Sequence, residues 1–417
     1  MWHRSPVQNA TSMNRRRFLG IGAAGLLAAG CDLSFRHGFV NNCRTPLPPA
    51  LRDHPVVLAA WRGLDPAKVW DVHCHVMGTG DSGTGPWMNP AMERIWQPRM
   101  YVQRLFYLNA GCAHNDPGKV DLSVVDRLVN QSEAMPAGYK SVLLAFDWAR
   151  DAAGAPDEQR STFHVPDEYA ADIVRRYPQH FEWAASIHPY DPRALDRLDA
   201  AAARGARAIK WLPSAQGIDP ASPQCDRFYA KLAALRMPLI THAGDEQAVA
   251  GHVEDLGNPL KLRRPLDAGV LVVVAHCASL GVGHDLDRGG EPQVSNFDLF
   301  ARLMDEPRYR ANLFADISAI TQGNRMGVIA PLLARRDWQD RLLNGSDYPL
   351  PGIVPLISLP GLVKLNVLDP AAVEPLREIR QHNVLLFDFV LKRTVASNGV
   401  GFAPSVFETA PFFKRPA

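Results

Sequence analysis

The sequence has no strong charge excess, few cysteines and, near its N-terminus, no hydrophobic run long enough for a membrane-spanning helix. The apolar stretch at residues 21–29 falls far short of the ~20 residues that such a helix needs. The formal net charge of +2 becomes −2 when the four arginines of residues 1–30 are set aside. No basic patch is left, so we expect no nucleic-acid partner. The six cysteines show no zinc-knuckle spacing, and those other than Cys31 are odd in number and cannot all pair.

What the sequence does have is length and apolar content. Its 417 residues, 47% of them hydrophobic, are enough for a large core. One barrel with insertions accounts for this length better than two domains do. We divide the chain into an N-terminal segment at residues 1–31, a tether and lead-in at residues 32–66, and the barrel at residues 67–417.

Eight apolar stretches, each with a polar residue near its C-terminal end, recur along the barrel region. They predict strands at residues 69–76, 139–148, 181–190, 206–212, 238–244, 270–278, 313–320 and 342–349. Most intervals can hold a helix, and this alternation indicates a parallel sheet covered on both faces. The pattern therefore predicts an α/β fold, a (β/α)8 TIM barrel with a long insertion after strand 1. Function gathers at the C-terminal strand ends of such barrels. The polar residues fall there: Asp147, His188, Lys210, His242, His276, Asp316 and Asp347.

The first predicted strand carries His73 and His75, two residues apart. Successive side chains alternate across a strand, so both imidazoles point the same way. Neutral imidazole is among the commonest ligands of divalent metals, and such a pair can share one cation. Alone, the pattern is weak evidence for a metal site.

Four short motifs, on strands one, five, six and eight, resemble those of the amidohydrolase superfamily, and most closely its amidohydrolase-related (type 2) branch. They are Asp-Val-His-Cys-His at 71–75, Ile-Thr-His-Ala-Gly at 240–244, Val-Ala-His-Cys at 274–277 and Gly-Ser-Asp-Tyr-Pro at 345–349. They occur in the family's order and span most of the chain. The resemblance implies that one catalytic metal ion is held by four ligands, His73, His75, His242 and Asp347. It also implies that His276 lies beside the metal-bound water.

The chemistry of these residue types supports that assignment. A divalent ion lowers the pKa of a bound water from about 16 to about 7, so hydroxide exists near neutral pH. Asp347 can accept the water's proton, and His276 can orient the nucleophile or stabilise negative charge on the substrate. Both are therefore predicted catalytic residues. Zinc and manganese both suit nitrogen and oxygen donors.

Each of these residues also has a purely structural interpretation. His242 and His276 could be buried core histidines, and Asp347 could belong to a turn, which Gly, Ser, Asp and Pro all favour. Asp71 is expected to hydrogen-bond to a ligand or to the next strand rather than to bind metal. Asp316 is expected to be structural.

Lys210 leaves the number of metals open. Some barrels of this superfamily carry a carbamylated lysine on strand four that bridges two metals, and Lys210 lies on that strand. With His276 as a further ligand, a second metal is the alternative to the single-metal site. His188 could face the substrate or simply pack.

The N-terminus resembles an export signal. Residues 14–20, Asn-Arg-Arg-Arg-Phe-Leu-Gly, are similar to a twin-arginine signal, and Ala-Ala-Gly-Cys at 28–31 is similar to a lipoprotein processing site. The resemblance implies passage through the twin-arginine export machinery to the periplasm. Lipidation of Cys31 would attach the protein to a membrane, and Asp32 would favour the inner membrane. The favoured leucine falls one place early, at Leu27, so ordinary cleavage and a soluble secreted enzyme are the alternative.

Two long connections follow predicted site residues. The interval between His75 and Tyr139 carries apolar and aromatic side chains that suggest a lid of short helices. The loop at 281–296 contains Arg288, which could grip a substrate carboxylate, although a solvated loop arginine is the simpler interpretation. Residues 378–396 are expected to form an apolar-faced terminal helix.

We therefore expect a metal-dependent hydrolase that acts on a small-molecule ester, lactone or amide at a mononuclear site. In the type 2 branch the same metal-binding residues also serve non-oxidative decarboxylases, and the sequence does not separate the two activities. A third hypothesis is a lipid-anchored metal-binding or partner-binding protein that has lost catalysis. The complete ligand set argues against it.

Overall fold

The computed structural model describes residues 39–414, apart from 114–115, 152 and 250–252. The predicted export signal at residues 1–31 lies outside this range. Eight parallel strands form the centre of the molecule. They are β1 (Trp70–His75), β3 (Lys140–Leu144), β5 (Phe181–Ala184), β6 (Ile209–Trp211), β7 (Leu239–Thr241), β8 (Val272–Val274), β11 (Leu313–Asp316) and β12 (Leu342–Leu343). Every predicted strand is thus confirmed, and each is shorter than its apolar stretch.

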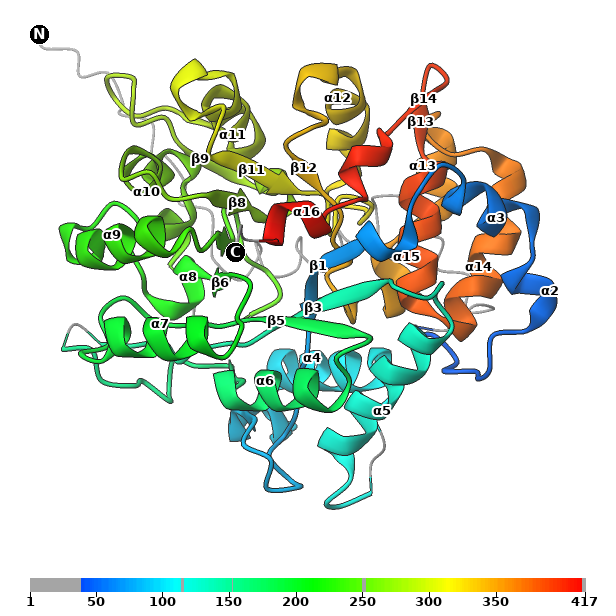
Figure 1. Ribbon diagram of the computed structural model, residues 1–417, viewed down its shortest axis with the longest axis horizontal. Helices are drawn as coiled ribbons and strands as arrows, with labels where there is room; N and C mark the ends of the chain where they lie inside the picture. The colour runs from blue at the N-terminus through cyan, green and yellow to red at the C-terminus, as the bar shows by residue number, and fades with distance from the viewer. Residues whose placement is uncertain (1–38, 114–115, 152, 250–252, 415–417) are drawn as a thin grey trace, which may run out of the picture.

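The strands follow one another in chain order around a barrel. One run has the order β1-β3-β5 and the other the order β12-β11-β8-β7-β6, with every neighbour parallel. Two isolated parallel bridges, Cys74 to Tyr348 and Ala185 to Ile209, join the two runs. The predicted (β/α)8 architecture is therefore confirmed (Figure 1).

The interior of the barrel is filled, and its N-terminal end is closed. A buried cluster takes side chains from all around the ring, and it continues into the C-terminal helix α16 (Ala410–Phe413). The ring of Phe412 lies 4.7 Å from that of Phe314 in β11, and the ring of Phe413 lies 6.2 Å from that of Trp70 in β1. Figure 1 shows α16 in the middle of the ring of strands. Any open site must therefore lie at the opposite, C-terminal end of the strands.

Helices surround the barrel because each has one apolar face. In α11 (Asn296–Asp305), Leu299, Phe300 and Leu303 are buried against the sheet, while Asp298 is exposed. The other outer helices are α5 (Val120–Glu133), α6 (Asp167–Arg176), α7 (Ala194–Ala203), α9 (Asp226–Leu235), α10 (Arg263–Asp267), α12 (Ile329–Ala334) and α13 (Leu359–Lys364). No helix in the described ranges has the length and apolarity that crossing a membrane requires.

The insertion after β1 contains a short strand, β2 (Trp87–Met88), followed by α4 (Pro98–Ala110). Strand β2 pairs with β4 (Phe163–His164), which follows β3, so the insertion extends across the neighbouring strand. Its glycine-rich start wraps around the carboxylate of Asp121, which accepts bonds from the backbone of Thr79 and the hydroxyl of Ser82. Gly78 is required there because a Cβ atom would lie 2.5 Å from Oδ1 of Asp121.

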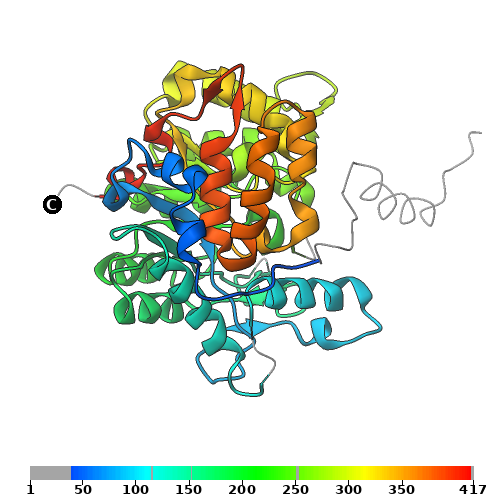
Figure 2. The ribbon, with the colours of Figure 1, turned by 90° about the vertical axis from the view of Figure 1, so that its right-hand side faces the viewer.

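The lead-in packs on the barrel through its helices α2 (Pro49–Arg52) and α3 (Pro55–Trp61). The ring of Trp61 stacks on Phe389 at 4.1 Å, and a disulfide joins Cys43 to Cys112 at the end of α4. Figure 2 shows α3 beside the C-terminal helices.

The prediction of one terminal helix at 378–396 is wrong. The chain forms two helices, α14 (Val373–His382) and α15 (Val384–Thr394), separated at Asn383. Asn383 adopts an extended conformation, and its side chain accepts a bond from the backbone of Leu386 to cap α15.

Candidate metal centre

His73 and His75 lie on the same face of β1, as the strand period predicts. Their Nε2 atoms approach one carboxylate oxygen, Oδ1 of Asp347, at 3.6 Å and 3.2 Å respectively. Asp347 follows β12, which neighbours β1 through the bridge at Cys74. Ligand atoms of these three residues all lie within 4.8 Å of one another, a spacing that a single metal ion can bridge.

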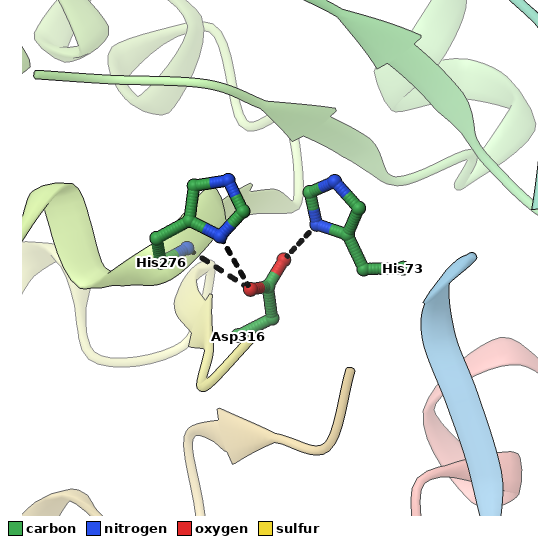
Figure 3. Close-up of side chains that lie close together, drawn as sticks. All are labelled: His73, His276 and Asp316. Carbon is green, nitrogen blue, oxygen red and sulfur yellow. Dashed lines mark hydrogen bonds and ion pairs between the residues drawn. The ribbon is translucent and has the colours of Figure 1, made fainter. Parts of the chain in front are cut away.

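Asp316, at the end of β11, orients two of the histidines (Figure 3). Its Oδ2 lies 2.9 Å from Nδ1 of His73, and its Oδ1 accepts a bond from the backbone of His276 at 2.9 Å. These contacts assign the proton of His73 to Nδ1, so Nε2 carries no proton and its lone pair is available to a donor or a metal ion. A carboxylate that holds a metal-ligating histidine in this way fixes both its orientation and its tautomer.

His276 is held by an unusual backbone. Three consecutive residues that are not glycine, His276, Cys277 and Ala278, have φ values of 55°, 52° and 48°. Such left-handed residues are costly and gather at functional sites. The Nδ1 atom of His276 lies 2.7 Å from the hydroxyl and 3.2 Å from the carbonyl of Ser318, which leaves Nε2 facing Oδ2 of Asp347 at 3.9 Å.

His242 lies next to this group but outside it. Its ring is 5.4 Å from that of His276, and both residues are buried. The two ring nitrogens face other atoms: Nε2 lies 3.2 Å from the carbonyl of Asp245, and Nδ1 lies 3.5 Å from Oε2 of Glu246. Its assignment as the fourth metal ligand stays a prediction.

Lys210, on β6, points into the same space. Its Nζ lies 3.0 Å from Nε2 of His73, and its side chain is buried. Burial lowers the pKa of Lys210, while Asp316 and Asp347 oppose that shift. The lysine is therefore close enough to take part in metal binding.

The charge states of the group suit a divalent cation. Burial, followed by the charge of Lys210, lowers the pKa of His73 to about 4. Burial also lowers the pKa values of His242 and His276. Burial alone would raise the pKa of Asp347, but His276 and His75 bring it well below its usual value. Neutral imidazoles and an ionised carboxylate are the forms that bind a metal ion, so this donor set fits one.

His188 and Arg288, which the sequence offered as possible substrate contacts, have structural partners instead. Both ring nitrogens of His188 are occupied, Nε2 at 3.1 Å from the carbonyl of Gln216 and Nδ1 by the backbone of Tyr190. Arg288 is exposed and pairs with Asp285 at 3.2 Å. The solvated interpretation of Arg288 is therefore the one that the structure supports.

Two residues near the site are not predicted from the sequence. Ser318 bonds both His73 and His276, while Arg325 is buried near His242, as is Glu246. Arg325 lies nine positions beyond the end of β11. No local pattern marks Ser318 or Arg325, although a polar residue two positions after Asp316 continues the strand's alternation.

Comparison with protein families finds that the model described as "Amidohydrolase" matches residues 70–374. No curated protein matches the sequence. Among solved structures, an uncharacterised TIM-barrel protein from Bordetella bronchiseptica is 15% identical over 77% of this chain and 99% of its own, with a TM-score of 0.45. A candidate 2-pyrone-4,6-dicarboxylic acid hydrolase from Pseudomonas putida is 15% identical over 77% and 97%, with a TM-score of 0.41. A 5-carboxyvanillate decarboxylase from Novosphingobium aromaticivorans, solved with manganese, is 12% identical over 76% and 94%, with a TM-score of 0.40.

Proposed function

Because this chain belongs to the amidohydrolase family, we propose that it is a metal-dependent hydrolase of a small ester, lactone or amide. The observation that carries the proposal is the convergence of His73, His75 and Asp347 at the open end of the barrel. His242 is proposed as the fourth ligand, and zinc or manganese as the metal. One ion is favoured, with a second at Lys210 and His276 as the alternative.

When bound, a divalent ion would supply hydroxide near neutral pH. The protein's own groups provide the rest of the chemistry. Asp347 is ionised, and its Oδ2, which is not the oxygen that faces His73 and His75, can take a proton from an attacking water. His276 presents an unprotonated Nε2 on the same side, 3.9 Å from Oδ2, where it can accept a hydrogen bond and orient that water. Asp316 and Ser318 keep the rings of His73 and His276 in these positions.

The first test is metal content. Purified protein should hold about one divalent ion per chain, and His73→Ala should lose it. The matched control is His284→Ala, because His284 is an exposed histidine on β9 (Val282–His284). Full metal occupancy in His73→Ala would overturn the proposed site.

The second test is the reaction itself. Metal-loaded protein would be offered a panel of lactones, esters, amides and aromatic acids, with proton release and carbon dioxide release measured in parallel. Proton release that disappears in Asp347→Asn supports the hydrolase. Carbon dioxide release would identify a decarboxylase instead, and inactivity on the whole panel would favour a binding protein.

We also propose that the chain is exported through the twin-arginine machinery and is attached to the inner membrane through Cys31. The disulfide between Cys43 and Cys112 supports an oxidising compartment. Cell fractionation tests this directly. Substitution of Arg15 and Arg16 by lysine should retain the protein in the cytoplasm, whereas Cys31→Ser should release it into the soluble periplasm. Recovery of the wild type in the soluble periplasm would remove the anchor.

A further inference from the structure

Arg325 lies at the rim of the metal centre, in the loop that follows β11. Its Nη1 donates to the hydroxyl of Ser279 at 3.2 Å, and the backbone of Ser279 bonds to the carbonyl of His276. On its other side, the neighbouring Asn324 lies 3.4 Å from Gln247, in the loop that carries His242. Arg325 therefore lies between the two loops that bring His242 and His276 to the site.

Among the described residues, the guanidinium of Arg325 has no counter-ion although it is buried. The residue is only 7% exposed, and its Nε atom has no hydrogen-bond partner in the part of the chain that the structure describes. Within the described ranges it forms no ion pair, and Ser279 is its one side-chain hydrogen-bond partner. A guanidinium has five N–H donors and stays charged in proteins, so most of its capacity is unused here. A buried charge without a partner is costly, which favours a role in binding something negative.

Three other buried arginines, Arg127, Arg341 and Arg380, also lack a carboxylate partner in the described ranges, but each of them donates to a backbone carbonyl. Arg150, in the connection after β3, is buried too, and it pairs with Asp191 at 2.9 Å. Arg380 has an unpaired Nε like Arg325, yet it lies over the ring of Phe387 at 4.6 Å and donates to the carbonyl of Val354. Arg150 thus has a charged partner and Arg380 an aromatic one. Within the described ranges Arg325 has neither, and the charges of Glu246 and Asp347 act on it after the effect of burial.

We propose that Arg325 binds a carboxylate of the substrate while the metal centre acts on another of its bonds. The inference rests on the proposed function and adds the substrate class, a small molecule with a carboxylate apart from the reacting bond. A guanidinium suits this group because its planar N–H fork matches two carboxylate oxygens. Arg288, which the sequence analysis considered for this role, is exposed and already paired with Asp285.

Binding of dicarboxylates to the metal-loaded full chain tests this inference. Succinate, glutarate and adipate would be titrated by calorimetry, each beside its monoamide, so that one carboxylate can meet the metal and the other can reach Arg325. We expect the tightest dicarboxylate to bind about tenfold more strongly than its monoamide, the effect of one charged hydrogen-bonded contact. In Arg325→Gln the ratio of the two affinities, dicarboxylate to monoamide, should fall to about one. In Arg325→Lys this ratio should fall part of the way. Arg380→Gln, which removes a buried guanidinium outside the site, should keep the wild-type ratio.

Three outcomes would overturn the inference: a wild type that binds none of the probes, one that does not distinguish acid from amide, or an Arg325→Lys variant with the full wild-type ratio. Arg325→Lys is the decisive variant if Arg325→Gln does not fold. Metal content and proton release on the same samples separate this inference from the proposed function. Loss of the ratio with metal and activity intact removes only the role of Arg325. A preserved ratio in metal-loaded protein that shows no proton release removes only the hydrolase.

Discussion

Nζ of Lys392 lies 2.5 Å from Oδ2 of Asp388, and the same ammonium donates to the carbonyl of Gly345. Gly345 begins the turn that carries Asp347, so a buried ion pair on α15 supports the loop of a predicted metal ligand. Oδ1 of Asp388 has no partner in the described structure, and neither does Oδ2 of Asp71, whose charge acts on Asp388. Support of this loop is therefore sensitive to the charge of Asp388.

Asp388 should make stability depend on pH. Burial raises its pKa from 3.8 to about 7, although Lys392 opposes the shift. The folded protein holds the proton more tightly than the unfolded chain, so this contribution is present below pH 3.8 and is lost as the pH rises through about 7. We expect the free energy of unfolding of the wild type to fall, relative to that of Asp388→Asn, between about pH 4 and about pH 8. Denaturant unfolding at several pH values measures the difference.

The control for this experiment is Asp298→Asn, an exposed aspartate on α11. Its unfolding free energy should follow that of the wild type at every pH. A parallel pH dependence of wild type and Asp388→Asn would mean that Asp388 is ionised throughout.

Asp316→Asn should weaken metal binding while leaving the fold intact. The amide keeps the shape of the carboxylate but loses the charge that holds His73 with its proton on Nδ1. Loss of such a supporting carboxylate costs about 10–100-fold in metal affinity. Metal affinity would be measured by competition with a chelating dye. Asp196→Asn, an exposed position on α7, is the control, and an unchanged affinity in Asp316→Asn would mean that Asp316 is purely structural.

The barrel could be predicted because the sequence pattern of each strand lies within a short stretch of the chain. Each strand is a short apolar run, and each polar residue at its end lies within a few positions of that run. The pairing of His73 with His75 follows from the alternation of side chains along one strand. Asp347 was found because it stands at the end of the last strand.

The partners of these residues could not be predicted because they come from distant parts of the chain. His73 and Asp316 are 243 positions apart, and no pattern around Asp316 shows which ring it holds. The break at Asn383 had a local signal, since asparagine is a favoured N-cap, but the apolar period continues across it. Arg325 belongs to an irregular loop, and only the folded structure shows that it lacks a counter-ion.

The disulfide between Cys43 and Cys112 should stabilise the protein. It closes a loop of 69 residues between the lead-in and the end of α4. Loops of this size contribute about 2–4 kcal/mol, mainly because the cross-link restricts the unfolded chain. We therefore expect a double variant, Cys43→Ser with Cys112→Ser, to lose roughly this free energy of unfolding. A reductant should lower the wild type to the same level and leave the variant unchanged; equal stability of both proteins without reductant would show that the bond contributes nothing.

His242→Ala tests the proposed fourth ligand, whose ring nitrogens face other protein atoms in the structure. The residue is buried 5.4 Å from the ring of His276, but Asp245 and Glu246 occupy the surroundings of its nitrogens. If it is the fourth ligand, its loss leaves His73, His75 and Asp347 with one donor fewer, and metal affinity should fall by at least about tenfold. The decrease should be smaller than in His73→Ala, because His73 also receives the support of Asp316. Isothermal titration with zinc measures both variants beside His284→Ala. An affinity equal to that of the control would make His242 a core histidine and reduce the centre to three protein ligands.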